Sequence, residues 1–141
     1  MKNVIFLIIA LLALTAFGCG SGKVGLSGHV TYSDDGSPLE TGTVGFATDT
    51  YFARGVLDKD GKYIVSSEHH KDGLPPGLYK VYVSGAEHQI GLDGNGVPIM
   101  EPLIDARHTS ASTSGLTLEV TAQTKTFDIK VDRYVPFQRR Q

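Results

Sequence analysis

The sequence predicts an all-β fold, a seven-stranded antiparallel β-sandwich that follows an N-terminal signal helix. Three observations lead to this expectation. Apolar and polar residues alternate with a period of two along several short stretches, as they do in half-buried strands. Clusters of Gly, Pro, Asp and Ser separate these stretches. The 141 residues include 17 glycines and no tryptophan, and nothing in the pattern after Cys19 requires a helix.

The amino end has the parts of a secretory signal. Met1–Asn3 carries a positive charge, and Val4–Phe17 is apolar except for one threonine. This run of about 14 residues is shorter than the roughly 20 that a transmembrane helix needs. We therefore expect residues 1–18 to be a signal peptide that is removed after export.

Cys19 is the only cysteine in the chain and follows the apolar run directly. The phrase Ala16-Phe17-Gly18-Cys19 resembles a bacterial lipobox, although the lipobox usually has Leu and a smaller residue at its first two positions. The resemblance implies cleavage before Cys19, lipid on its sulfur, and a flexible tether over residues 19–23. We expect a membrane-anchored lipoprotein in the periplasm or at the cell surface. Gly20, in place of an inner-membrane retention Asp, favours the outer membrane. The alternative is an ordinary signal peptide with a chance cysteine near its end.

Residues 24–133 are expected to form the sandwich. Asp58-Lys59-Asp60-Gly61, between the third and fourth predicted strands, is expected to be a hairpin turn. We interpret residues 58–61 as a simple turn and not as a fragment of a calcium loop, because a calcium loop needs more oxygen ligands. The first four strands are expected at Gly25–Tyr32, Thr41–Thr48, Tyr51–Leu57 and Lys62–Ser67.

The second half contains three further predicted strands and one long loop. Leu78–Ser84 follows a Gly-Leu-Pro-Pro-Gly entry, and the last two strands are expected at residues 116–121 and 127–132. Between the first and second of these strands, Glu87–Ser114 contains three glycines and two prolines, all within residues 91–102, and is expected to be irregular. A loop this long is typical of a functional or mobile segment. The pattern leaves open whether the tail, residues 134–141, packs or stays loose.

Several phrases in order resemble carboxypeptidase regulatory-like domains. The opening of such a domain resembles residues 28–32, 36–39 and 42–46, and its second hairpin resembles residues 53–63. Its proline–glycine strand entry resembles residues 74–81. Residues 102–104, 114–117 and 126–129 are similar to the close of small lipoproteins with this domain in planctomycete-type bacteria. The resemblance implies a transthyretin-like sandwich and brings no established activity with it.

Charge and motifs argue against two classes of function. The formal charge is −2 with no basic stripe, so we expect no nucleic-acid partner. The chain has no Gly-x-Ser-x-Gly elbow, and no acidic pair lies in an apolar context. We therefore expect a protein that is not an enzyme and that needs no cofactor and no metal.

The leading hypothesis is a non-catalytic binding or structural accessory module of the cell envelope. Its partners are expected to be the membrane, through lipid on Cys19, and an unidentified envelope protein or polysaccharide. Loops at the ends of sandwiches commonly carry recognition. Two alternatives remain. One is a metal- or His-dependent hydrolase that uses the adjacent residues His69 and His70, and the other is a small-ligand carrier. The candidate binding residues are Glu68, His69, His70 and Asp72 in one loop, and His88, Asp93 and Asn95 in the other.

Overall fold

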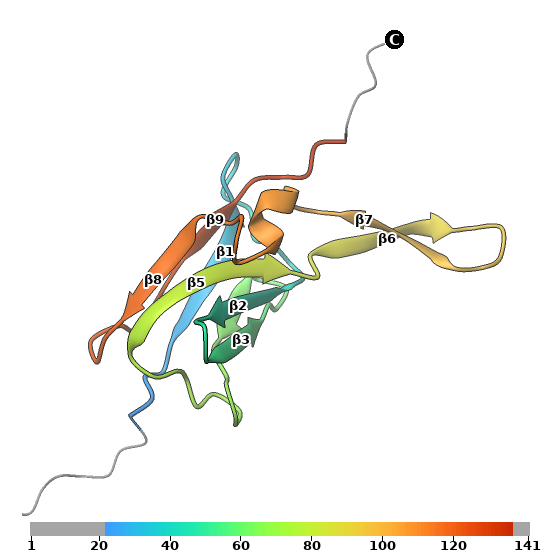
Figure 1. The fold of residues 1–141 in the computed structure, drawn as a ribbon. Coiled ribbons are helices and arrows are strands. Elements are labelled where there is room, and N and C mark those ends of the chain that lie inside the picture. The colour runs from blue at the N-terminus through green and yellow to red at the C-terminus, as the bar shows by residue number, and fades with distance from the viewer. Residues whose placement is uncertain (1–21, 137–141) are drawn as a thin grey trace, which may run out of the picture.

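The computed structural model describes residues 22–136, and the predicted signal peptide and Cys19 lie outside this range. The chain folds into two facing β-sheets and one long hairpin (Figure 1). No helix among residues 22–136 is both long and apolar enough to cross a membrane. The elements in chain order are β1 (Ser27–Tyr32), β2 (Thr43–Ala47), β3 (Phe52–Val56), β4 (Lys62–Ile64), β5 (Gly77–Ser84), β6 (Glu87–Leu92), β7 (Pro98–Pro102), the 3-10 helix η3 (Ala106–Thr109), β8 (Leu116–Val120) and β9 (Ile129–Val131).

The two sheets have three and four strands. The smaller has the order β4-β1-β9, and the larger has the order β3-β2-β5-β8. A bridge between Arg54 and Ser66 joins the β3 edge of one sheet to the end of β4 in the other. The expectation of a wholly antiparallel fold is wrong at one place, because β9 pairs with β1 in parallel. A parallel pair requires a long connection, and here most of the chain separates the two strands.

The core lies between the two sheets, where alternate side chains of each strand point inward. Val30 and Ile129 enter it from the smaller sheet, and Val44 and Val81 enter from the larger one; all four are buried. The rings of Phe46 and Tyr63 meet with centroids 6.0 Å apart and planes inclined at 42°, a tilted arrangement that aromatic pairs favour. This inward alternation confirms the period-two pattern that predicted a β-sandwich.

Nine strands are present in residues 22–136, so the expected number of seven is too low. The two extra strands, β6 and β7, lie in the segment Glu87–Ser114 that we expected to be irregular. The glycines and prolines that led us to predict an irregular segment fall mainly at the tip and the ends of this hairpin. The same segment contains η3, although no helix was expected after Cys19.

Some strand ends agree with the expected ones, and the others differ by up to three residues. The fourth predicted strand ends at Ile64 instead of Ser67, because Ser66 and Ser67 turn into the next loop. The seventh begins at Ile129 instead of residue 127. In the described part of the tail, the Tyr134 amide donates to the Leu103 carbonyl at 3.1 Å, and residues 134–136 form no strand.

Candidate functional site

The first candidate loop, residues 66–72, is organised around the carboxylate of Asp72. This carboxylate accepts hydrogen bonds from the amides of Ser67, Glu68 and His69 at 2.7, 3.1 and 3.0 Å. It also accepts from the Ser67 hydroxyl at 2.9 Å. Because its oxygens are occupied in this way, Asp72 holds the loop together and is not free to bind a ligand.

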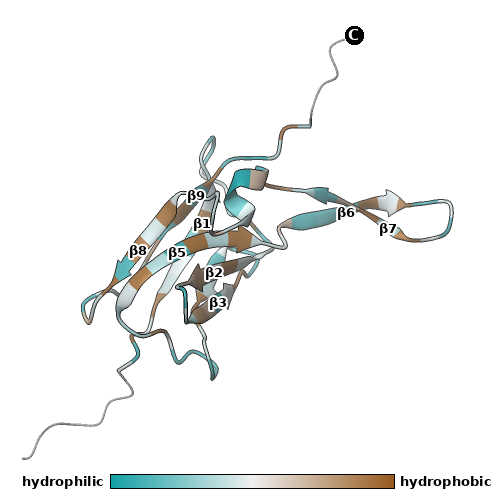
Figure 2. Ribbon diagram, viewed as in Figure 1, coloured by the Kyte–Doolittle hydropathy of each residue, from teal (hydrophilic) through white to brown (hydrophobic). Residues whose placement is uncertain are grey.

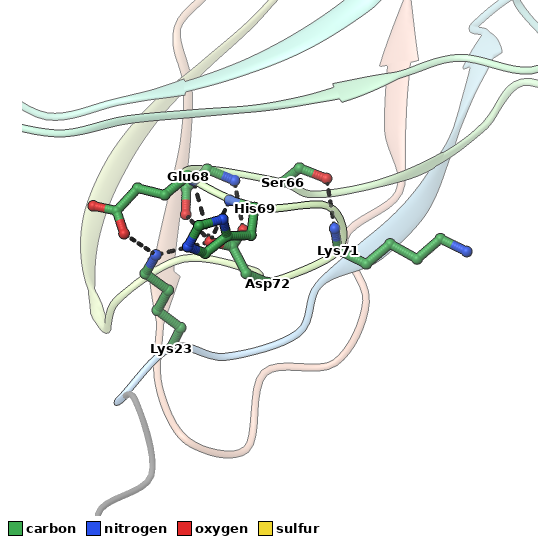
Figure 3. Close-up of polar contacts among 7 residues, drawn as sticks. Lys23, Ser66, Glu68, His69, Lys71 and Asp72 are labelled. Atoms are coloured by element: carbon green, nitrogen blue, oxygen red, sulfur yellow. Dashed lines mark hydrogen bonds and ion pairs between the residues drawn. The ribbon is translucent and has the colours of Figure 1, made fainter.

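Lys23 completes this arrangement from the amino end of the described chain. Its ammonium lies 2.8 Å from an Asp72 oxygen and 2.9 Å from a Glu68 oxygen (Figure 3). The side chains of Lys23 and Asp72 are only 13% and 15% exposed. The hydrogen bond with Lys23 holds the pKa of Asp72 well below its usual range, and the same bond raises the pKa of Lys23. We expected Lys23 to belong to a flexible tether, and its ion pairs instead fix it to the loop.

The rest of the loop is turned outward. Lys71 adopts a left-handed conformation with φ 59°, the single positive φ of a non-glycine residue among residues 22–136. Its amide donates to the Ser66 hydroxyl at 2.8 Å, and Figure 3 shows its side chain pointing away from Asp72. His69 and His70 are exposed. A non-glycine residue in this conformation is strained, and such strain is concentrated at binding sites.

A groove of about 560 Å³ runs between this loop and the outer face of β3 and β4. We call it the β3–β4 groove, and its lining includes Arg54, Val56, Lys62, Ile64, His69 and Lys71. Val56 of the larger sheet and Ile64 of the smaller sheet give it an apolar floor, since both side chains are exposed. Among residues 22–136, the cationic groups of Arg54, Lys62 and Lys71 have no ion-pair partner. Two acidic residues, Asp58 and Glu68, also line the groove. Glu68 is paired with Lys23, and Asp58 accepts hydrogen bonds from two backbone amides. Within the described chain, the charged side chains of the groove that have neither a hydrogen bond nor an ion pair are therefore the three cations.

The second candidate segment is not a loop but a long hairpin that projects from the sandwich. We call residues 87–102 the arm. Figure 1 shows it extending to the right, away from both sheets, while the first described residues lie at the lower left. Its strands β6 and β7 pair only with each other. A hairpin of two strands without a supporting layer is only marginally stable in water by itself.

The arm exposes an unusual amount of apolar surface. Five large apolar side chains on it are between 43% and 60% exposed, and Figure 2 shows brown segments along it that no other element covers. Exposed apolar patches of this kind mark interaction sites more often than isolated exposed residues do. The five are Ile90, Leu92, Val97, Ile99 and Met100.

The three candidate residues of the arm have different positions. The Asp93 carboxylate accepts from the amides of Asn95 and Val97, both at 2.8 Å, and so closes the tip of the hairpin. Asn95 lies exposed in the tip. His88 Nε2 lies 3.6 Å from Glu101 Oε2 on the paired strand. Asp93 is thus a turn residue, as Asp commonly is, and His88 forms part of a cross-strand pair.

The two candidate segments are not brought together. No hydrogen bond or ion pair between residues 66–72 and residues 87–102 is present in the described chain. Over the same residues, no three His, Cys, Asp or Glu side chains form a group that could hold a metal ion. The histidines of the two segments therefore do not share a site.

His108 is a residue that sequence reasoning did not select. It is buried at the start of the segment that follows the arm, and its Nε2 accepts from the Asp132 amide at 3.1 Å. Its Nδ1 has no partner within residues 22–136. Burial lowers the pKa of His108, and the neighbouring Arg107 guanidinium lowers it further. No sequence pattern marked this histidine as buried, because η3 was not expected.

Comparisons with known proteins add little. No protein-family model and no curated protein match the chain. The chain is similar to part of a 9R-lipoxygenase from Cyanothece, with 16% identity, a TM-score of 0.44, and coverage of 84% of this chain and 18% of that one. It is also similar to part of the major pilin subunit of Bacillus cereus, with 12% identity, a TM-score of 0.44, and coverage of 79% and 30%. The chain therefore spans less than a third of either protein, and its function is inferred from its own residues.

Proposed function

We propose that the protein is a lipid-anchored, non-catalytic binding module of the cell envelope, and that its arm is the element that binds the partner. The single observation that carries this proposal is the arm itself, with five exposed apolar side chains and no supporting layer. Apolar surface of this kind gains free energy when a partner covers it. The transthyretin-like and carboxypeptidase regulatory-like assignment of the sandwich remains part of the same proposal.

The arm is built to bind through side chains rather than by adding a strand. The pairing of β6 is interrupted by a register shift between Gln89 and Gly91, and such bulges discourage further pairing. β7 begins with Pro98 and ends with Pro102, and proline offers no N–H group to an added strand. The exposed apolar side chains are thus the groups that remain for recognition.

The proposed anchor and the arm are at opposite ends of the molecule. Cys19 precedes Lys23 by four residues, which span at most about 14 Å. Lys23 is fixed to the loop 66–72, so lipid on Cys19 would hold that end of the sandwich near the membrane. The arm leaves the other end, as Figure 1 shows. With the sandwich lying along the membrane, this arrangement would let the arm reach a partner anchored beside it.

The experiment is site-specific photo-cross-linking in intact envelopes with the full chain. A photoreactive residue replaces Leu92 on the arm, and the matched control replaces Glu119, which is exposed on β8. We expect efficient capture from position 92 and background capture from position 119. Equal capture from both positions would contradict the proposal.

The anchor is tested separately by the mass of the N-terminal peptide of the mature protein. Lipid on Cys19 predicts a peptide that begins at Cys19 and carries the mass of acyl chains. An unmodified Cys19, or cleavage at another bond, would remove the anchor from the proposal and leave the role of the arm standing.

A further inference from the structure

The arm and the β3–β4 groove have complementary properties. The arm contains Glu87, Asp93 and Glu101 and no lysine or arginine, so acidic groups accompany its exposed apolar side chains. The groove has an apolar floor and three cationic side chains without ion-pair partners in the described chain. Both surfaces offer apolar contact, and the unpartnered cations of the groove are opposite in charge to the acidic groups of the arm. The acidic groups of the groove, Asp58 and Glu68, are already engaged by backbone amides and by Lys23.

Both surfaces are on one chain, yet they cannot meet within one molecule in this fold. Figure 1 shows the arm extending away from β3 and β4, and the groove opens on the outer face of these two strands. A contact between them would therefore join two copies. It would be heterologous, because the arm of one copy would meet a different surface on the next.

We propose that the arm of one copy docks in the β3–β4 groove of a second copy, so that the chain assembles head to tail. This inference rests on the proposed function of the arm and names its partner. Leu92 pairs with Pro98, so it shares one face of the arm with Met100, two residues further along β7. The exposed side chains of Leu92 and Met100 face the floor formed by Val56 and Ile64. The acidic residues of the arm face Arg54, Lys62 and Lys71. Each docked copy leaves one free arm and one free groove, so assembly continues beyond a dimer.

The inference also accounts for the conformation of the loop 66–72, which borders the β3–β4 groove and is called the groove loop below. The Asp72 carboxylate and Lys23 hold residues 66–72 in one conformation, and that conformation turns Lys71 outward at one side of the groove. A backbone held in one conformation loses less conformational entropy when a partner binds. The loop is thus shaped before the arm arrives.

The test uses cysteine pairs in the full chain in its own membrane. A chain that carries both Leu92→Cys and Ile64→Cys is oxidised mildly, and the products are separated by mass. We expect a ladder of dimers, trimers and higher species. The matched control carries Leu92→Cys with Thr117→Cys, which is exposed on β8, and it should not form a ladder. The unaltered chain, whose only cysteine is Cys19, is oxidised in parallel to reveal any dimer that forms through Cys19.

Charge reversal makes the test specific. The pair Arg54→Glu and Lys71→Glu should lower the cross-linked fraction at least about tenfold, because like charges then face each other across the contact. The pair Glu87→Lys and Glu101→Lys should lower it similarly. Mixing groove-reversed chains that carry Ile64→Cys with arm-reversed chains that carry Leu92→Cys should restore the cross-link, since both sets of charges are then exchanged.

The outcomes separate this inference from the proposed function. If position 92 captures other envelope proteins but no second copy, the inference is overturned and the arm remains a binding element. If position 92 captures nothing above the control, both the inference and the proposed function of the arm are contradicted. A ladder that persists after charge reversal would also overturn the inference, because opposite charges would then not direct the arm into the groove.

Discussion

At the scale of single residues, Asp72 has the largest effect on the groove loop. One carboxylate accepts three backbone amides, one hydroxyl and one ammonium. Each of these donors favours the charged form of the group, and this is why its pKa lies below the ordinary range. Asp72 was selected from the sequence as a binding residue, and its contacts instead give it the task of shaping the loop.

A change at Asp72 has a defined pH signature. Because its pKa is lower in the folded than in the unfolded chain, its contribution to stability is present above the unfolded value of about 3.9 and is lost as the pH falls below it. The Asp72→Asn variant keeps the size of the side chain and loses the charge. We expect it to be less stable than the unaltered chain at pH 7, with a smaller difference at pH 3. Urea unfolding at the two pH values measures this. An equal difference at both would contradict the ion-pair account.

His108 gives a second pH dependence with a different window. Its folded pKa is lowered by burial and by Arg107, and the carboxylate of Asp105 opposes this shift; the Asp132 carboxylate lies 3.3 Å from its Nε2. The unfolded chain therefore binds the proton more readily, and stability is lost as the pH falls through about 6.5.

The matching variant is His108→Gln, which keeps a hydrogen-bond acceptor and does not titrate. We expect the unaltered chain to lose stability between pH 7.5 and pH 5.5, and we expect a smaller loss in the variant. Thermal unfolding across this range checks the expectation. Identical slopes for the two proteins would show that the histidine does not carry the effect.

At the scale of elements, the approach of β1 to the segment before β9 depends on a missing side chain. A Cβ atom on Gly28 would lie 1.9 Å from the Phe127 carbonyl oxygen, which is backbone and cannot rotate away. Gly25, two residues before β1, has no atom within 4 Å of such a Cβ. The two glycines therefore form a matched pair for mutation.

We expect Gly28→Ala to destabilise the protein by about 2 kcal/mol or more, since the parallel pair of β1 and β9 must move apart. Gly25→Ala should change the free energy of unfolding by less than about 0.5 kcal/mol. Denaturant unfolding of both variants measures the difference. Equal stabilities would mean that the two segments do not approach as described.

The arm should contribute little to the stability of the sandwich. Its strands pair only with each other, and none of its residues belongs to the buried core. Replacing residues 88–101 with Asn-Gly leaves Glu87 and Pro102 to be joined by a two-residue turn. We expect the free energy of unfolding to change by less than about 0.5 kcal/mol, as for a surface substitution. A loss of several kcal/mol would show that the arm supports the fold.

The sequence indicated the sandwich strands better than the arm, for a physical reason. The core strands bury one face, so they alternate in polarity, as Tyr79, Val81 and Val83 do on β5. The arm buries neither face, so its strands carry no such alternation, and its glycines and prolines suggested an irregular loop. The parallel pairing of β9 with β1 also leaves no local pattern, because it depends on residues about 100 positions apart.

The candidate site was predicted in part. Both segments chosen from the sequence carry features of interest, but the residues chosen for their chemistry serve mainly to hold turns. Asp93 closes the hairpin tip and Asp72 closes the loop. Asp favours turns and ligand sites for the same reason, which is that its carboxylate accepts several hydrogen bonds. The apolar side chains of the arm and the cations Arg54 and Lys62 were not among the candidate residues, because their exposure appears only in the fold.

At the scale of the whole molecule, three parts have separate tasks in our proposal. The amino end attaches the protein to the membrane, the two sheets provide a rigid body, and the arm reaches the partner. The ion pairs of Lys23 connect the first part to the second. The arm joins the body at Ala86 and Leu103, where the Leu103 amide donates to the Ala86 carbonyl at 2.8 Å. We therefore expect binding by the arm to leave the two sheets unchanged.

Hydrogen exchange along the full chain tests the central claim, that the arm is the binding element, most directly. Exchange is measured by mass spectrometry on the protein in isolated envelopes and on the purified protein at high dilution. We expect the amides of residues 87–102 to exchange more slowly in the envelope, because a bound partner excludes water from the hairpin, and we expect the β5 amides to exchange equally in both. Equal exchange of the arm in the two preparations would contradict the account.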